Sequence, residues 1–263
     1  MTIKQPALLD ASHYKRPIRI ETGGAIALTH QAIVADADGV DRRAYVKHFP
    51  SSSPKGLLNE WIGHTVMSAL GVPQPDASVM LAPIGGTGQL AWSFVSFAPS
   101  PVHEGTPKEI YDLSLAVHAD VLADRLTACP SFAAMVAADQ LCMNPDRNLG
   151  NLVFTGKRTF VVIDHGEILG GSHWSVDSLV KPTNWVKSVP LLFCHSRGKL
   201  KASLRSQIYA ASQVSSERLW KKYPDLRNVF SQQNRETQIA LDAVWWRSLD
   251  VAQWFRNELQ LVV

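Results

Sequence analysis

Residues 144–166 read Asn-Pro-Asp-Arg-Asn-Leu-Gly-Asn-Leu-Val-Phe-Thr-Gly-Lys-Arg-Thr-Phe-Val-Val-Ile-Asp-His-Gly, and this stretch decides the fold. It contains two short apolar runs, Leu152–Phe154 and Phe160–Ile163. The polar sequence Thr155-Gly-Lys-Arg158 between them is typical of a tight turn. The stretch therefore predicts a polar loop followed by a β-hairpin.

A hairpin brings its two outer ends together, so Asp146 and Asn151 should meet Asp164 at one mouth. Two carboxylates and an amide are oxygen ligands of the kind that Mg²⁺ prefers. Phosphoryl transfer in kinases uses an Asp beside the acceptor hydroxyl, then an Asn and a second Asp on the metals. Taken separately, each half is also explained by an Asx-Pro turn or a strand-capping Asp. Joined by a hairpin, the two halves favour a kinase-type site.

This segment resembles the catalytic core of the HipA-like serine/threonine kinases and of the wider protein-kinase-like fold. The pattern Asp-Arg-x-x-x-Asn, a hairpin and Ile-Asp-x-Gly is also similar to the phosphatidylinositol kinases. The resemblance implies that Asp146 is the catalytic Asp and that Asn151 and Asp164 are metal ligands. It also places Asp164-His165-Gly166 where protein kinases have Asp-Phe-Gly. The His-Arg-Asp triplet is absent and His165 replaces Phe, which argues against an ordinary eukaryotic-type protein kinase.

Two residues nearer the amino terminus extend the resemblance. Tyr45-Val-Lys47 resembles the Val-Ala-Ile-Lys strand of kinases, whose Lys pairs with the nucleotide phosphates. A Lys that alternates with apolar residues is also typical of the solvent-exposed face of any strand. Residues 57–70 predict an amphipathic helix that stops at Gly71. Glu60 lies in its first turn, where the helix dipole favours an anion and where a Glu would orient Lys47. An exposed Glu at a helix start, however, needs no function.

Two further segments are candidates for nucleotide contact. Gly23-Gly24 is a candidate phosphate-covering loop, although it lacks the Gly-x-Gly-x-x-Gly spacing and is equally compatible with a plain turn. Residues 90–97 alternate like a strand and end at Ala98-Pro99, which we interpret as a hinge between two lobes. The backbone there would hydrogen-bond an adenine edge, so Ser96 and Phe97 are assigned to the nucleotide site.

The remaining elements follow from periodicity and turn residues. Asp38-Gly39 between strand-like runs predicts a second hairpin within residues 17–49. Residues 78–82 predict a strand. Helices are expected over residues 106–127, 131–143, 202–214 and 231–261. An aromatic-rich stripe at residues 243–255 is interpreted as core packing.

The composition of the chain limits the classes of protein to which it can belong. The chain has 263 residues, 46% hydrophobic and 19% charged, which is ample for a buried core. A net charge of +3 is too small to argue for nucleic-acid binding. Cys129, Cys142 and Cys194 show no metal spacing and suggest reduced thiols, hence a cytoplasmic protein. No run reaches the roughly 18 apolar residues needed to cross a bilayer, so no membrane contact is expected.

These observations predict an α+β, bilobal protein-kinase-like fold, with an antiparallel β amino lobe over residues 1–97 and a mainly α-helical carboxy lobe over residues 98–263. The resemblance implies a HipA-like kinase that uses ATP and Mg²⁺ to phosphorylate a Ser or Thr hydroxyl of a protein substrate. By family analogy it also implies a toxin role with an antitoxin partner. Two alternatives stay open. One is a small-molecule phosphotransferase of the aminoglycoside or choline kinase type, although Asn144 stands where those enzymes have His. The other is a non-catalytic pseudokinase that binds a partner.

Overall fold

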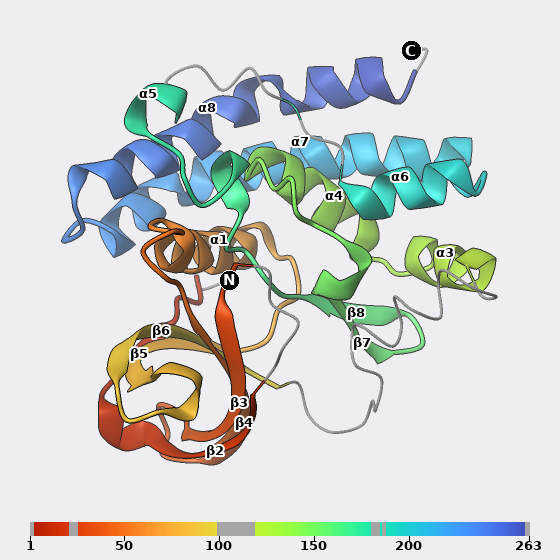
Figure 1. The fold of residues 1–263 in the computed structure, drawn as a ribbon. Helices are drawn as coiled ribbons and strands as arrows, with labels where there is room; N and C mark the ends of the chain where they lie inside the picture. The colour runs from red at the N-terminus through yellow and green to blue at the C-terminus, as the bar shows by residue number, and fades with distance from the viewer. Residues whose placement is uncertain (1–2, 21–25, 99–118, 180–184, 186–187, 261–263) are drawn as a thin grey trace.

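The computed structural model describes residues 3–20, 26–98, 119–179, 185 and 188–260. A curved β-sheet forms one end of the molecule, and a layer of helices forms the other (Figure 1). The sheet is built from the amino-terminal residues and the helical layer mainly from the carboxy-terminal ones. The predicted α+β class is therefore confirmed, while the division of the chain at residue 97 stays a prediction.

The sheet has six strands in the order β1-β5-β6-β4-β3-β2. Neighbouring strands are antiparallel except at one edge, where β1 runs parallel to β5. The three residues of β1 carry no pattern of their own, so the sequence did not predict this strand. The strands are β1 (Ala7–Leu9), β2 (Tyr14–Ile20), β3 (Leu28–Ala35), β4 (Asp41–His48), β5 (Ala77–Pro83) and β6 (Leu90–Phe97).

The hairpin predicted at Asp38-Gly39 joins β3 to β4. Gly39 has φ +80°, a left-handed conformation that glycine adopts without steric cost. The side chain of Asp36 accepts hydrogen bonds from the backbone N–H groups of Asp38 and Val40, at 3.1 and 3.0 Å. This turn sets the register that pairs Thr29 with Lys47 across the two strands.

Helix α1 (Gly56–Leu70) follows β4 and ends where expected. Gly71 adopts the left-handed conformation, and its N–H donates to the carbonyl of Ser68 while that of Val72 donates to Met67. The helix differs from the predicted amphipathic one because it is buried on nearly all sides, with polar residues such as Asn59 and Glu60 enclosed. It is buried because it lies between the sheet and the helical layer (Figure 1).

The two faces of the sheet bury different apolar sets. The sheet is curved, so the side chains on one of its faces pack against one another. This core includes Val34, Val46, Met80, Val95 and Phe97. The opposite face buries a smaller set against α1: Ala77, Val79 and Phe94, together with Leu57 and Trp61.

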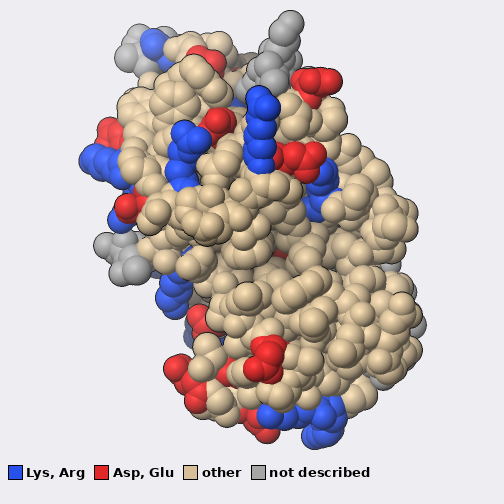
Figure 2. All heavy atoms as spheres, turned by 90° about the vertical axis from the view of Figure 1, so that its left-hand side faces the viewer, with Lys and Arg blue, Asp and Glu red and all other residues tan. Residues whose placement is uncertain are grey.

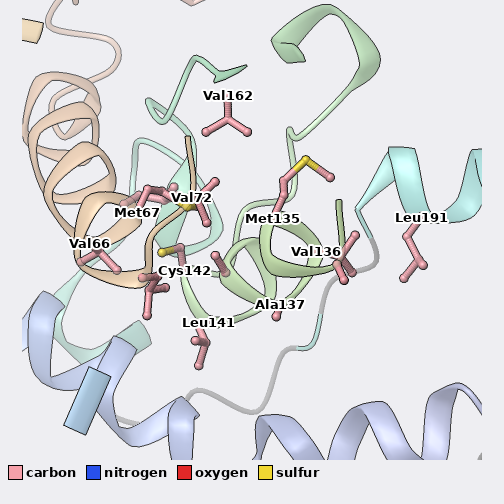
Figure 3. Close-up of a cluster of buried hydrophobic side chains, with 14 of the residues drawn as sticks. Val66, Met67, Val72, Met135, Val136, Ala137, Leu141, Cys142, Val162 and Leu191 are labelled. Atoms are coloured by element: carbon pink, nitrogen blue, oxygen red, sulfur yellow. The ribbon is translucent and has the colours of Figure 1, made fainter. Parts of the chain in front are cut away.

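The helical layer holds the largest core. Val66 and Met67 of α1 share it with Met135, Val136 and Leu141 of α4 (Figure 3). Helix α1 therefore belongs by packing to the helical layer as much as to the sheet. The helices of this layer are α3 (Ala119–Thr127), α4 (Phe132–Leu141), α5 (Val176–Leu179), α6 (Val189–Ser196), α7 (Ala202–Val229) and α8 (Arg235–Glu258).

Several helix boundaries differ from the predictions. Helix α7 extends from the predicted end at Val214 to Val229 and passes through Pro224, because Leu219 and Leu226 continue its buried face. Helix α6 was not predicted. Of the helix expected over residues 106–127, only α3 falls among the described residues, and residues 106–118 lie outside them.

Charged side chains lie in small groups of both signs over both ends of the molecule on the face shown in Figure 2. Among the helices of the described ranges, none is by itself long and apolar enough to cross a membrane. Helices α3 and α4 meet that length and composition only when taken together, across a bend of 86°.

Gly63 marks the closest approach of α1 to the loop that follows the predicted catalytic hairpin. A Cβ atom added at Gly63 would lie 2.4 Å from the Cβ atom of buried His165. No side chain fits there unless one of the two backbones moves.

Gly63→Ala should therefore destabilise the protein. Overpacking a core costs about 1–3 kcal/mol, and a contact this short lies at the upper end, above the gain of about 1 kcal/mol in helix propensity. Urea unfolding of the variant, compared with wild type, would measure the loss. Gly88→Ala is the matched control, since a Cβ there meets nothing within 4 Å. Equal stability of the two variants would contradict the packing argument.

Candidate active site

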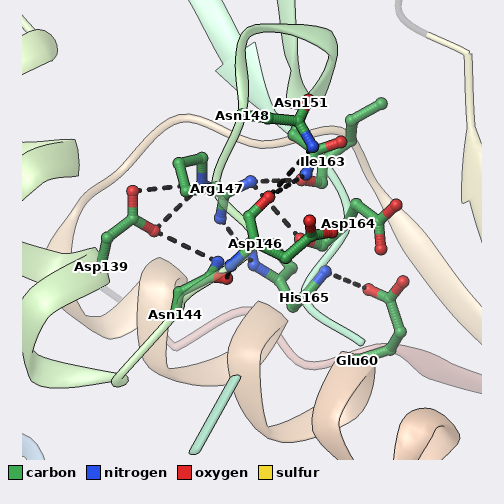
Figure 4. A network of polar contacts seen from close by, with 10 residues as sticks. All are labelled: Glu60, Asp139, Asn144, Asp146, Arg147, Asn148, Asn151, Ile163, Asp164 and His165. Carbon is green, nitrogen blue, oxygen red and sulfur yellow. Dashed lines mark hydrogen bonds and ion pairs between the residues drawn. The ribbon is translucent and has the colours of Figure 1, made fainter. Parts of the chain in front are cut away.

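The predicted catalytic hairpin is formed by β7 (Leu152–Gly156) and β8 (Thr159–Val162), which pair antiparallel. Beyond the last strand pair, the N–H of Ile163 donates to the carbonyl of Asn151 at 3.0 Å. The side-chain amide of Asn151 donates to the carbonyl of Asp146 at 2.9 Å. Asp146, Asn151 and Asp164 therefore gather at one mouth, as the sequence predicts (Figure 4).

Lys47 projects from β4 into the same place. Its ammonium lies 2.8 Å from Oε1 of Glu60 and 3.0 Å from Oδ1 of Asp164. The other carboxylate oxygen of Glu60 accepts a hydrogen bond from the N–H of His165 at 2.9 Å. Glu60 is fully buried and lies beyond the first turn of α1, which begins at Gly56. The predicted first-turn position is therefore wrong, and the alternative of an exposed helix-start Glu does not hold either.

The three charges of this cluster shift one another's pKa values. Burial lowers the pKa of Lys47, but the negative charges of Asp164 and Glu60 outweigh it and raise the pKa. Burial raises the pKa of Glu60, and the ammonium of Lys47 only partly opposes this. Burial would also raise the pKa of Asp164, but Lys47 more than compensates and lowers it. The cluster therefore keeps a charged Lys47 and an ionised Asp164.

Asp146 lies on the loop between α4 and the hairpin, and its side chain is exposed. Its N–H donates to the side-chain oxygen of Asn144 at 3.2 Å, and its carbonyl accepts from the amides of Asn148 and Asn151. Partial desolvation, and then the negative charge of Asp164, raise the pKa of Asp146. The backbone of this loop is thus fixed while its carboxylate stays accessible.

Asn59 joins α1 to the segment that follows Asp164, a role that the sequence did not suggest. Its amide donates to the carbonyls of Gly166, Ile168 and Gly171, at 2.8, 3.0 and 3.1 Å. Its side-chain oxygen accepts from the indole N–H of Trp174 at 2.8 Å. Asn59 is completely buried, so it holds this segment against the helix that carries Glu60.

Arg147 was part of the quoted motif but had no assigned role. Its fully buried guanidinium contacts Asp139, His165 and the backbone after β8 (Figure 4). Burial and the positive charge of Arg147 hold the pKa of His165 well below its usual range, so this imidazole is neutral. A signal was present in the sequence: Asp139 is the one charged residue in the apolar helix Phe132–Leu141, and a buried charge needs a partner.

The remaining predicted site residues are at the sheet. Gly23 and Gly24 lie outside the described residues, so their role stays a prediction. Ser96 and Phe97 end β6, and the side chain of Phe97 is buried in the sheet core. The N–H groups of Phe97 and Ala98 already donate to the carbonyls of Asp76 and Arg43, at 3.0 and 2.9 Å. An adenine would therefore have to meet carbonyl groups here, or residues beyond Ala98.

Comparison with solved structures bears on the fold. The Helicobacter pylori proinflammatory kinase CtkA superposes with a TM-score of 0.61 at 14% sequence identity, covering 97% of this chain and all of that one. The chain has a protein-kinase-like fold. At this identity the likeness concerns the fold alone.

A second solved structure is the HipA, HipB and operator DNA complex of the Shewanella oneidensis MR-1 toxin–antitoxin system. A chain of it matches with a TM-score of 0.49 at 9% identity, over 95% of this chain and 69% of that one. No protein-family model matches the sequence, and no curated protein matches it.

Asn59→Ala should destabilise the protein by at least about 3 kcal/mol, because each unmet buried polar group costs about 1–3 kcal/mol and several are affected. The substitution leaves three carbonyls and the indole N–H of Trp174 without this partner. Denaturant unfolding measures the change. Asn228→Ala, on the exposed face of α7, is the control and should have little effect. A variant at Asn59 that unfolds like the control would show that these contacts contribute nothing.

Proposed function

We propose that this protein is an ATP-dependent kinase that transfers the γ-phosphoryl group to a Ser or Thr hydroxyl of a protein substrate. The observation that carries the proposal is the meeting of Lys47 with Glu60 and Asp164, beside the loop of Asp146. These residues come from four separate parts of the chain. Their types are the ones that phosphoryl transfer requires.

Lys47 would hold the nucleotide phosphates. Its ammonium is charged at all physiological pH values, since the neighbouring carboxylates raise its pKa. Glu60 would keep that ammonium in place, because its second oxygen is already fixed by the N–H of His165. Gly23, Gly24 and the chain at Ser96 and Phe97 are proposed to enclose the rest of the nucleotide.

Asn151 and Asp164 would hold Mg²⁺. The side-chain N–H group of Asn151 is used on the carbonyl of Asp146, which leaves its amide oxygen as the group to meet a cation. Asp164 has an ionised carboxylate with 39% of its side chain exposed, so it can accept a ligand from solvent. Both are hard oxygen donors and fit the metal. When bound, Mg²⁺ would neutralise negative charge on the phosphates.

Asp146 would position the acceptor hydroxyl and take its proton. The carboxylate is exposed at the mouth, and its raised pKa makes it a better base than an ordinary Asp. An antitoxin partner stays a prediction from the sequence resemblance alone.

The direct test is transfer of labelled phosphate from ATP in the presence of Mg²⁺, with generic protein substrates and, separately, aminoglycosides and choline. Labelled protein supports the proposal. Labelled small molecules would favour the phosphotransferase alternative instead. Nucleotide binding without any transfer would favour the pseudokinase alternative.

Substitution of the two aspartates should separate binding from transfer. Asp146→Asn keeps the shape but removes the proton acceptor, so Mg-ATP should still bind while transfer falls about 10²–10⁴-fold. Asp164→Asn removes a negative charge at the metal position, so it should weaken Mg²⁺-dependent ATP binding as well as transfer. Calorimetric titration with Mg-ATP and a transfer assay would measure both effects. If both variants bind and transfer like wild type, the proposed site is wrong.

The raised pKa of Asp146 predicts the acid side of the pH–rate profile. The base must be deprotonated, so the rate falls as pH drops through its pKa, at a pH above the value of about 3.9 for an ordinary Asp. Glu167 contributes to the raised pKa through its negative charge. Glu167→Gln should therefore move the acid limb of kcat/KM, which reports the free enzyme, to lower pH. Glu217→Gln on α7 is the control, and an unmoved limb in both variants would contradict the assignment.

A further inference from the structure

Arg147 is among the largest fully buried side chains of the described part of the molecule. Its Nε lies 3.0 and 3.1 Å from the two carboxylate oxygens of Asp139. One terminal nitrogen donates to the carbonyl of Ile163 and lies 3.4 Å from that of Asp164. The other lies 3.1 Å from Nδ1 of His165 (Figure 4). One guanidinium thus holds three consecutive residues.

The residue in the middle of these three needs holding. Asp164 has φ +64°, a left-handed conformation that costs a non-glycine residue energy. Such strain persists only where the surroundings over-determine the backbone. The contacts of Arg147 fall on Asp164 itself and on the residues before and after it. Arg147 is therefore placed to fix the direction in which the Asp164 carboxylate points.

Asp139, at the end of α4, anchors two arms of one network. Its first arm is the guanidinium of Arg147, which reaches the backbone of Asp164. In the second arm, the amide of Asn144 lies 3.4 Å from Asp139, and the oxygen of that amide accepts from the N–H of Asp146 at 3.2 Å. The buried carboxylate of Asp139 is thereby connected to both aspartates of the proposed site, to Asp164 through Arg147 and to Asp146 through Asn144.

We propose that Arg147, oriented by Asp139, is a positioning residue that sets the placement of Asp164 relative to Asp146. The inference rests on the proposed function for its effect on catalysis. It also makes a claim about the free protein, because the contacts join residues of the chain itself. A buried ion pair adds little net stability compared with apolar residues of similar size, so stability alone does not account for this one.

The test uses the double variant Asp139→Leu/Arg147→Met of the 263-residue chain, which removes both buried charges together and avoids leaving one unpaired. We expect it to fold, with a cooperative thermal transition. In the nucleotide-free protein, hydrogen exchange of residues 163–166 should speed up, while that of strand β7 stays as in wild type. Transfer should fall about 10²-fold, the effect of misplacing a catalytic group by about 1 Å. Calorimetry should show that Mg²⁺ no longer strengthens ATP binding.

Two further proteins complete the design. Arg147→Lys keeps the charge, but an ammonium cannot reproduce the planar fork, so it should show the same changes in smaller degree. It also serves if the double variant does not fold. The control is Asp124→Leu/Lys199→Met, which removes a partly exposed ion pair of 2.9 Å that makes no contact with the described residues of the site and should change none of these readouts.

The outcomes separate the two proposals. Folded variants at Arg147 with wild-type exchange, transfer and Mg²⁺ dependence would overturn the positioning role and leave the proposed function standing. A wild-type protein that neither binds Mg-ATP nor transfers phosphate would overturn the proposed function. Faster exchange at residues 163–166 in the variants would still support the positioning role in that case.

Discussion

The rest of the site depends on the pairing of the buried Lys47 ammonium with two carboxylates. A charge removed from water must be paired, and Lys47 is paired with carboxylates from two other parts of the chain. Glu60 comes from α1 and Asp164 from the loop after β8. If either element moved away, a buried charge would lose its partner. The sheet, the helix and the hairpin are therefore held in one arrangement by a constraint that the apolar cores alone do not impose.

Helix α1 transmits this constraint to the segment after Asp164. Asn59 and Gly63 are one helical turn apart, so they face the same side. Asn59 binds three carbonyls of that segment, and Gly63 admits the side chain of His165 at close range. The N–H of His165 in turn reaches Glu60. The helix and the segment form one packed unit, so Glu60 is held at Lys47 by contacts within the protein itself.

Local pattern was enough to predict the elements that carry the site, and long-range contacts were not predictable. The two hairpins and the stop of α1 at Gly71 follow from turn chemistry and periodicity, as does the convergence of Asp146, Asn151 and Asp164. Strand β1 pairs with a strand far along the chain and has no signal of its own. Asn59 is buried against partners more than a hundred residues away in the sequence. For Arg147, the charge of Asp139 signals a buried partner, but the contact with the carbonyl of Ile163, sixteen residues away, does not follow from local pattern.

Burial and the charges of the network together explain the direction of its pKa shifts. Glu60, Asp139, Asp146 and Asp164 are four carboxylates. The ammonium of Lys47 contacts Glu60 and Asp164, and the guanidinium of Arg147 contacts Asp139. The cluster of these six residues carries an excess of negative charge, and the charge of Asp164 adds to burial, the larger cause, in raising the pKa values of Glu60 and Asp146. A divalent cation at Asp164 would neutralise that excess. The site would then bind polyphosphate through the cation and Lys47 together, since neither charge alone offsets both the carboxylates and the phosphates.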